Sequence, residues 1–396
     1  MQIDLLSAES FAHGQPHEQF RWLRANAPVY RHPEPYGPGF WALTRHDDVR
    51  EVSRNHGVFS NEPTIMIADA AAPPAMRDKM MLMCDPPQNT QLRRLVSHAF
   101  TPKAARALAP RIQTIAREII DAVIARGECD LVADVAGELP SFVIAEMLGL
   151  PRDDGRMLYR LTETLHSTTE AAGQAAQAAA GLEMFTYSAQ VVAEKRARPR
   201  DDLASLLLHT ELDGRRLTDM EFHLFFMLLV DAGGDTTRNL VAGGMLALLE
   251  RPDQLALLRD DLEARLPTAR EELLRFTSPV VYMRRSARQD AEVAGQPIQE
   301  GDKVVLYYGS ANRDEAAFER PDELDVLRSP NRHVAFGATG AHFCLGAQIA
   351  RVEIDAMLRE ILTRLDDLEL AAEPEWLPSN FISGPRHMPV RFRAAS

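Results

Sequence analysis

The stretch RHVAFGATGAHFCLG at residues 332–346 decides the fold, because it places a single cysteine, Cys344, at the start of a helix predicted over 345–365. Backbone N–H groups and the dipole at a helix N-terminus stabilise an anion, so we expect the Cys344 side chain to be a thiolate. The glycines of the stretch let the backbone pass close to a flat, bulky ligand. A thiolate beside room for a large planar group indicates axial ligation of haem iron; a buried structural cysteine in a turn is the alternative.

Outside this stretch, the residue patterns predict a mainly α protein with small antiparallel β-sheets (α+β), in a single domain over 1–396. Helical periodicity dominates about 85–276, whereas strand-like patterns gather in about 28–60, about 280–310 and the C-terminal 366–396. The individual strand-like runs are 40–44, 280–284, 293–298, 303–308 and 390–393. Prolines are scattered between the helices rather than gathered in a hinge, which favours the single domain.

Composition excludes several classes of partner. The 396 residues carry a formal net charge of −13, which argues against nucleic-acid and anionic-membrane partners, since both need a positive field. The 3 cysteines are an odd number and lie far apart, so we expect no disulfide framework and a reducing compartment. The N-terminal residues lack the pattern of a secretory signal, and no apolar run is long enough to span a bilayer. We therefore expect a soluble, cytoplasmic protein.

A second unusual feature is the centre of a long helix predicted over 218–250. The sequence of this helix has apolar residues around its whole circumference, as expected for a buried helix. Its middle reads AGGDT at 232–236, although each glycine costs about 1 kcal/mol relative to alanine inside a helix. Burying the charge of Asp235 beside the glycines costs still more free energy unless the carboxylate is paired or hydrogen-bonded. This interruption predicts a functional role for the centre of the helix.

The cysteine stretch resembles the haem loop of the cytochrome P450 family, Phe-Gly-x-Gly-x-His-x-Cys-x-Gly, and the chain looks like a soluble bacterial member. The matching residues are Phe336, Gly340, His342, Cys344 and Gly346. Phe336 stands eight residues before the cysteine instead of the usual seven, so the loop carries one extra residue. The resemblance implies the cytochrome P450 fold, with haem b between the long helix and the cysteine loop and with Cys344 as the axial ligand of the iron.

Further motifs of the family occur in the expected order. Glu272 and Arg275 match its ExxR pair, and their i, i+3 spacing puts both charges on one helix face. The resemblance implies a bidentate ion pair that supports the haem loop from behind. Other matches are Ala311-Asn312-Arg313-Asp314, Phe318, Pro321 and Arg328 before the haem loop, and Trp41-Ala42-Leu43-Thr44, Asp48-Val49 and Phe59-Ser60 near the N-terminus.

By the same resemblance, the AGGDT segment lies across the distal face of haem, where dioxygen binds. Ala232 and Gly233 are expected to contact the cofactor, and the glycines are expected to let the helix open locally for dioxygen and a water. Asp235 and Thr236 match the family's acid–alcohol pair, which relays protons to the distal oxygen.

The resemblance also implies contacts around the rest of the haem. Its propionates are anions that need cations or hydrogen-bond donors, for which Arg93, Arg285 and His333 are the candidates. The family usually has histidine four residues before Arg93, where this chain has Asn89, so we expect weaker anchoring of one propionate. The haem contacts expected from the cysteine loop are Phe336, Gly337 and Gly346.

Positions that line the substrate site in the family are apolar and rich in methionine in this chain, which predicts a sizeable hydrophobic substrate such as a steroid, terpenoid or lipid. They include Met66, Met81, Val280, Val281 and Phe381. The implied reaction inserts one atom of O2 into a C–H bond and needs two electrons. Because the chain has no flavin or iron–sulfur motif, a ferredoxin and an NAD(P)H-dependent ferredoxin reductase are the implied partners.

Two other functions remain open at this point. A peroxide-driven haem-thiolate peroxygenase does not need the acid–alcohol pair, and a non-catalytic haem-binding sensor needs no proton relay. The presence of Asp235 and Thr236 therefore favours the monooxygenase.

Overall fold

The chain folds into two compact units in a computed structural model, which describes residues 1–35, 37–69, 79–166, 171–211 and 214–395. Unit 1 comprises Met1–Gln91, Glu263–Leu345 and Leu377–Gly384. Unit 2 comprises Leu92–Leu262, Gly346–Trp376 and Pro385–Ser396. The single domain predicted over 1–396 stays a prediction.

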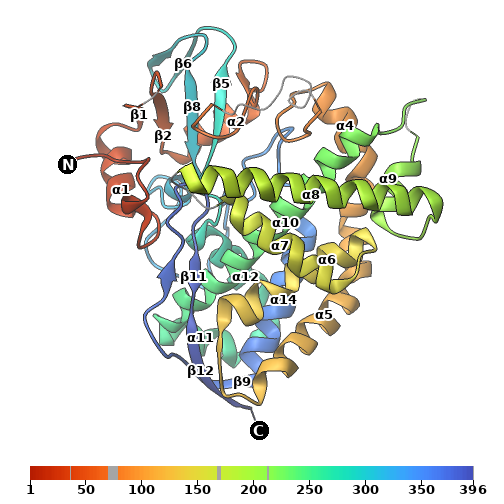
Figure 1. Cartoon of the computed structure of the whole chain (residues 1–396). Helices are drawn as coiled ribbons and strands as arrows, with labels where there is room; N and C mark the ends of the chain where they lie inside the picture. Colours follow the sequence, from red (N-terminus) through yellow and green to blue (C-terminus); the bar gives the residue numbers. More distant parts are fainter. Residues whose placement is uncertain (36, 70–78, 167–170, 212–213, 396) are drawn as a thin grey trace. The chain divides into compact units, whose positions relative to one another are not determined.

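Unit 1 is organised around a five-stranded sheet in the order β1-β2-β8-β5-β3 (Figure 1). Strands β2 and β8 pair in parallel, and the other neighbours pair antiparallel. The strands are β1 (Val29–His32), β2 (Phe40–Leu43), β3 (Phe59–Ser60), β5 (Tyr282–Ala287) and β8 (Lys303–Tyr307). The helices are η1 (Glu9–Phe11), α1 (His17–Asn26), α2 (His46–Arg54), α12 (Leu262–Thr277) and α13 (Tyr308–Ala311), and α4 (Gln88–Val96) begins in this unit.

Strand β8 is buried along its whole length because both faces of the sheet are covered. Val304 and Leu306 belong to one apolar cluster, which includes residues of α2. Val305 and Tyr307 belong to a second cluster, which includes residues of α1. Because side chains alternate between the two faces of a strand, the apolar residues of β8 pack against a helix on each face of the sheet.

The single strand predicted over 293–298 is wrong, because the structure forms a hairpin at this place. Strands β6 (Ala291–Val293) and β7 (Gln296–Ile298) pair antiparallel. They are joined by Ala294 and Gly295, with φ of 49° and 80°. Two successive residues with positive φ match the twist of a two-residue hairpin. Alanine seldom adopts this conformation, so the turn was not predictable from the residue types at 294 and 295.

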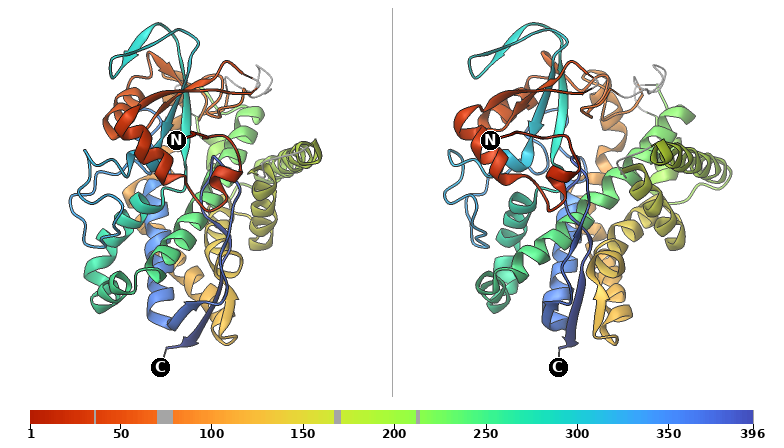
Figure 2. Two further views of the ribbon diagram at one scale, coloured as in Figure 1. Left: turned by 90° about the vertical axis from the view of Figure 1, so that its left-hand side faces the viewer. Right: turned by 60° about the vertical axis from the view of Figure 1, so that its left-hand side comes forward.

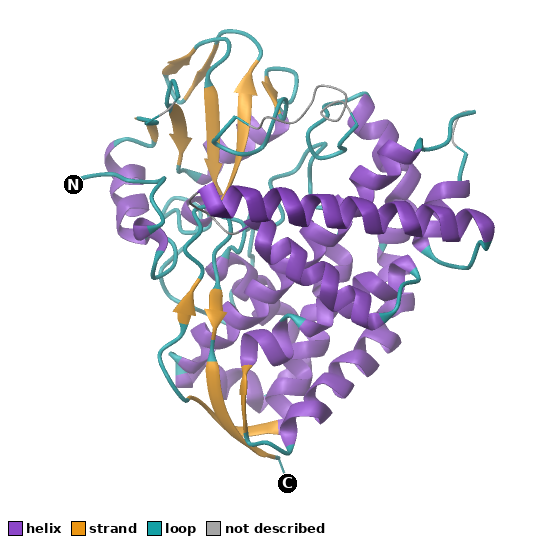
Figure 3. Cartoon of the chain, viewed as in Figure 1, coloured by secondary structure: helices purple, strands orange, loops and turns teal. Residues whose placement is uncertain are grey.

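Unit 2 contains most of the helices and two small sheets (Figure 3). Its helices are η2 (Ser97–Phe100), α5 (Pro102–Ile124), η3 (Leu131–Ala136), α6 (Glu138–Leu148), α7 (Arg152–His166), α8 (Ala171–Ala197), α9 (Leu203–His209), α10 (Asp219–Leu249), α11 (Pro252–Asp260) and α14 (Ala347–Arg364). Its strands are β4 (Glu128–Asp130), β9 (Leu365–Leu370), β10 (Glu375–Trp376), β11 (Pro385–His387) and β12 (Pro389–Ala394). The sheets are β4-β12-β9 and β10-β11, and Figure 2 shows β9 and β12 side by side near the C-terminus.

Helix α10 lies at the centre of unit 2, packed against α6, α7, α8 and α14. It begins with a capping box, in which the Thr218 hydroxyl accepts from the Glu221 N–H and the Glu221 carboxylate accepts from the Thr218 N–H. Helix α10 continues through Gly233 and Gly234, and the local opening expected there stays a prediction. A Cβ at Gly233 would lie 3.4 Å from Ile144 Cδ1, and one at Gly234 would lie 3.3 Å from Tyr159 Cδ2. The glycines therefore let α6 and α7 pack closely against α10.

These elements confirm the prediction of a mainly α chain with small sheets, although the five-stranded sheet is mixed rather than antiparallel because β2 and β8 run in parallel. Within the described residues, no helix combines the length and apolar character needed to cross a membrane.

Candidate active site

The cysteine loop of unit 1 closes on itself despite its extra residue. The Cys344 N–H donates to the Phe336 carbonyl oxygen at 2.9 Å, and the Cys344 side chain is partly exposed. Gly340 has a φ of 149°, and a Cβ there would lie 3.0 Å from the Ser53 carbonyl oxygen. Gly337 has a φ of 79°, which also favours glycine. The loop thus presents one accessible thiol on a backbone that turns sharply at glycines.

The predicted pair Glu272 and Arg275 is present on α12, and both side chains are fully buried. Arg275 Nε and Nη2 donate to the two carboxylate oxygens of Glu272 at 2.7 and 2.8 Å. The same guanidinium donates to the carbonyl oxygens of Asn312 and Pro321 at 2.8 and 2.7 Å. Arg328 Nε adds bonds of 3.1 Å to both oxygens of Glu272. This network ties α12 to the segment that precedes the cysteine loop.

Arg285 on β5 is a buried cation that fits an anionic ligand. Its guanidinium donates to the Arg284 carbonyl oxygen at 2.9 Å and bonds the Tyr308 hydroxyl, and within the described residues it forms no ion pair. Burial lowers the pKa of Arg285, against the opposing effects of Tyr308 and Asp85. A carboxylate-bearing group such as a haem propionate would supply the missing counter-charge.

A second observation in unit 2 also fits the cofactor. Gly346, the residue before α14, has a φ of −79°, which any residue adopts, and a Cβ there would meet no protein atom within 4 Å. Protein packing therefore does not explain this glycine, whereas close approach of a flat ligand would. The residues present fit haem.

Two of the predicted propionate contacts bond other protein groups. His333 Nε2 lies 3.0 Å from Glu271 Oε2, and its Nδ1 accepts from the Ala335 N–H at 3.2 Å. Asn89 Nδ2 donates to the Met81 carbonyl oxygen at 2.8 Å, and its Oδ1 is buried without a partner. Asn89 Nδ2 also lies 3.4 Å from His342 Nδ1, so both of its N–H groups are directed at protein atoms, and the unpartnered Oδ1 can only accept a hydrogen bond.

Arg93, the third candidate, lies half-buried in the last turn of α4.

Asp85 connects the segment before α4 to the cysteine loop, and the motif analysis missed it. It accepts hydrogen bonds from the Ser60 hydroxyl and from the Asn61 N–H, and it pairs with Arg288 at 2.8 Å. His342 Nε2 lies 3.4 Å from Asp85 Oδ1. Burial raises the pKa of Asp85, but the bonds from His342, Ser60 and Asn61 outweigh it and leave that pKa lowered. Asp85 therefore contacts His342, which lies two residues before Cys344 in the cysteine loop.

The predicted relay residues lie on different faces of α10. Asp235 is buried, and its carboxylate pairs with Arg238 at 3.4 Å. Thr236 is partly exposed, and its hydroxyl donates to the Ala232 carbonyl oxygen at 2.9 Å. Ala232 is exposed although it lies in the middle of the central helix. Ala232 and Thr236, four residues apart, thus form an open stripe on α10.

The substrate-lining candidates of unit 1 are only partly brought together. The Val281 N–H donates to the Phe381 carbonyl oxygen at 2.9 Å, and Val280 forms an isolated antiparallel β-bridge with Ile382. Val281 itself is fully buried in the apolar cluster of α1 and β8, so its side chain has no surface left for a ligand. Met66 and Val280 are half-buried, and Met81 is buried.

Glu353 on α14 is a buried acid that lies next to the relay and that sequence reasoning missed. It accepts from the Thr237 hydroxyl at 3.3 Å, and burial raises its pKa to about 8. Its only sequence signal was a charge among the apolar positions of the helix. At neutral pH this carboxyl is mostly protonated in the folded protein.

Replacing Glu353 by glutamine should change how stability depends on pH. Between the ordinary glutamate pKa and about 8, folded Glu353 keeps a proton that the unfolded chain releases, so stability falls as pH rises. Glu353→Gln removes this loss and should stabilise the haem-loaded protein at pH 8 by on the order of 3 kcal/mol, with little change at pH 5. Urea unfolding at the two pH values measures it. Glu360→Gln, which breaks an ion pair with Arg364 on the same helix, should destabilise at both.

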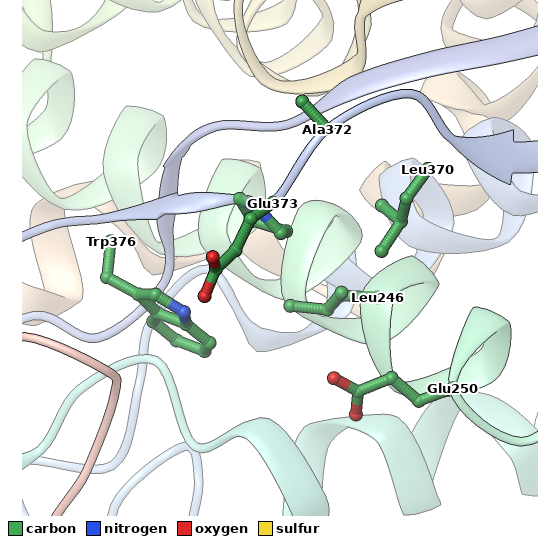
Figure 4. A pocket seen from close by; sticks show the side chains of 7 residues that line it. Leu246, Glu250, Leu370, Ala372, Glu373 and Trp376 are labelled. Carbon is green, nitrogen blue, oxygen red and sulfur yellow. The ribbon is translucent and has the colours of Figure 1, made fainter.

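A pocket of about 320 Å³ opens in unit 2 at the C-terminal end of α10 (Figure 4). Leu246 and Glu250 of α10 line it together with Leu370, Glu373 and Trp376 from the β9–β10 region. Glu250 lies fourteen residues beyond Thr236, about 20 Å along the helix, so this pocket is separate from the open stripe.

Comparison with known proteins identifies the class. A sequence model of the family "Cytochrome P450" matches residues 139–374. A "Steroid C26-monooxygenase" of Rhodococcus jostii is 36% identical over 100% of this chain and 85% of its own length. A "Methyl-branched lipid omega-hydroxylase" of Mycobacterium tuberculosis is 38% identical over 94% of this chain and 90% of its own. The solved Mycobacterium marinum cytochrome P450 CYP268A2 in complex with pseudoionone is 38% identical, with a TM-score of 0.92 over 99% of both chains.

The chain is a haem-thiolate monooxygenase. It belongs to the cytochrome P450 family, as the resemblance predicted, and the fold and the haem cofactor are confirmed with it.

Proposed function

We propose that this cytochrome P450 inserts one atom of O2 into a C–H bond of a sizeable hydrophobic substrate of the steroid, terpenoid or lipid class. The observation that carries the proposal is the open stripe of α10, where Thr236 is accessible beside the buried Asp235. The relatives support the substrate class, since their names assign them steroids and methyl-branched lipids. Met66, Val280 and Phe381 are half-buried apolar side chains of unit 1 that we assign to the substrate.

Each residue then has a defined task. Haem supplies the activation of dioxygen when it is bound, and Cys344 holds its iron. Arg285 binds a propionate, and Glu272 with Arg275 keeps the segment before the cysteine loop in place. Thr236 donates and accepts hydrogen bonds at the oxygen-binding position, and Asp235 supplies the protons that Thr236 passes on.

Electrons come from NAD(P)H through a ferredoxin reductase and a ferredoxin. Arg94, Lys103 and Arg106 are exposed at the end of α4 and the start of α5, where they offer a positive surface to an acidic ferredoxin. Peroxide-driven turnover is the second candidate. Turnover of a screened steroid or fatty acid with NADH, ferredoxin and reductase, compared with turnover by hydrogen peroxide alone, separates the two. Equal rates with peroxide alone would overturn the ferredoxin-dependent proposal. Cytoplasmic location stays a prediction.

Replacing Thr236 by alanine should uncouple electron use from product formation. Without the hydroxyl, proton delivery to the distal oxygen is unguided, so NADH consumption continues while most of the electrons leave as hydrogen peroxide. A positioned proton-transfer group contributes roughly 10²–10⁴-fold to a rate, so we expect the product formed per NADH to fall by at least about tenfold. Thr236→Ser keeps the hydroxyl and should retain most of the coupling. Unchanged coupling in Thr236→Ala would show that Thr236 is not the relay.

A further inference from the structure

Arg238 lies one turn after Asp235 on α10 and is almost as buried, with 2% of its surface exposed. Its Nη2 lies 3.4 Å from Asp235 Oδ1. Its Nη1 donates to Glu163 Oε1 of α7 at 2.6 Å. The guanidinium also lies over the ring of Tyr159, 5.2 Å from its centre, and the Tyr159 hydroxyl donates to Glu163 at 3.3 Å. One cation is therefore shared between two carboxylates.

The two carboxylates differ in how much they need this cation. The Asp235 side chain is 3% exposed, whereas that of Glu163 is 41% exposed. A buried carboxylate depends on neighbouring charge to stay ionised, while an exposed one is stabilised by water. The shorter contact nevertheless goes to Glu163. The guanidinium of Arg238 therefore lies closer to the exposed carboxylate of Glu163 than to the buried carboxylate of Asp235.

We propose that Arg238 is a positioning residue that holds Asp235 charged and oriented, and that Glu163 regulates Asp235 by competing for the same guanidinium. The inference rests on the proposed function, because it concerns regulation of the relay through Asp235 and Thr236. When Glu163 is removed, the guanidinium turns wholly to Asp235 and Asp235 binds a proton less readily. When the guanidinium is removed, the buried Asp235 binds a proton more readily. The two changes act in opposite directions.

Among the described residues, the charged groups that contact Arg238 come from two helices. Asp235 and Arg238 belong to α10, and Tyr159 and Glu163 belong to α7, with mutual electrostatic effects among all four. Glu353 of α14 faces Thr237, which lies about 200° around α10 from Asp235. A shift in the protonation of Asp235 is therefore attributed to changes at Arg238, Glu163 or Tyr159.

Infrared difference spectroscopy of the haem-loaded protein between successive pH values tests the proposal without a substrate. The band of protonated Asp235 is assigned by its loss in Asp235→Asn. Arg238→Gln should move the midpoint of this band upward by at least about one pH unit, a tenfold gain in proton affinity, and Glu163→Gln should move it downward. Arg238→Lys should restore most of the original midpoint. Glu183→Gln, which removes an exposed carboxylate from α8, should leave it unchanged.

An unchanged midpoint in both Arg238→Gln and Glu163→Gln, or a shift of both in the same direction, would overturn the proposal. If Arg238→Gln does not fold, Glu163→Gln and Arg238→Lys still give the direction of the shift. The carbon monoxide spectrum is recorded on the same samples. If the carbon monoxide spectrum of the unmodified protein lacks the thiolate signature, the proposed function is contradicted. The infrared titration tests only how Arg238 and Glu163 affect the protonation of Asp235.

Discussion

Arg275→Ala is expected to give the largest loss of stability of any single substitution in the site. The change removes five hydrogen bonds, two to Glu272 and one each to the carbonyl oxygens of Asn312, Pro321 and Glu323. It leaves the Glu272 carboxylate fully buried with Arg328 as its remaining cation. Breaking one side of a buried ion pair costs about 3–5 kcal/mol. Because the network holds the segment before the cysteine loop, we also expect the purified variant to retain little haem.

Two further variants on the same helix test the reason for this loss. Arg275→Lys keeps the charge but not the fork of donors, so it should lose part of the stability and of the haem. Arg270→Ala removes an arginine that is 15% exposed and whose partner Glu271 is 23% exposed, so water can replace part of the lost pair and the variant should cost less than Arg275→Ala. Urea unfolding and the ratio of haem to protein absorbance measure both effects. A loss in Arg275→Ala no larger than that in Arg270→Ala would contradict the structural role of the buried network.

Cys344→Ala is expected to abolish the thiolate-type spectrum and all monooxygenase turnover. Cys344 is the one thiol on the loop, and its backbone N–H is already held by the Phe336 carbonyl oxygen, so removing the side chain leaves the loop in place. The iron then has no anionic ligand to donate electron density for cleavage of the O–O bond. The absorbance of the reduced, carbon monoxide-bound protein measures the change directly.

Cys129→Ala is the matched control for this substitution. Burial raises the pKa of the Cys129 thiol to about 12, so this side chain stays protonated and cannot serve as a thiolate ligand. The Cys129 variant should keep the spectrum of the unmodified protein. A thiolate spectrum that persists in Cys344→Ala would show that another group binds the iron.

Local patterns predicted the parts of the site that depend on residues close in sequence. Glu272 and Arg275 lie at i, i+3 on one helix, so their meeting follows from helix geometry alone. The position of Cys344 just before α14 also follows from the glycines and the apolar periodicity around it. The mainly helical fold was predictable for the same reason, since helical hydrogen bonds and apolar stripes are local.

Contacts between distant segments were not predictable from the same patterns. Arg238 is shared with Glu163, which is 75 residues earlier, and Glu353 meets Thr237 across 116 residues. Only the packing of α7 and α14 against α10 brings these groups together. The glycines of α10 were interpreted only as an opening for dioxygen, and the structure shows that they allow close packing of α6 and α7. Sequence alone could not separate these two reasons for a glycine.

The carbon monoxide difference spectrum of the dithionite-reduced, purified protein tests the central claim most directly. A Soret band at the strongly red-shifted position of a thiolate-ligated haem is the predicted result, and it would establish Cys344 as the ligand when compared with Cys344→Ala. A band at the shorter-wavelength position of a histidine-ligated haem, or the absence of haem from the purified protein, would contradict the assignment of the cysteine loop.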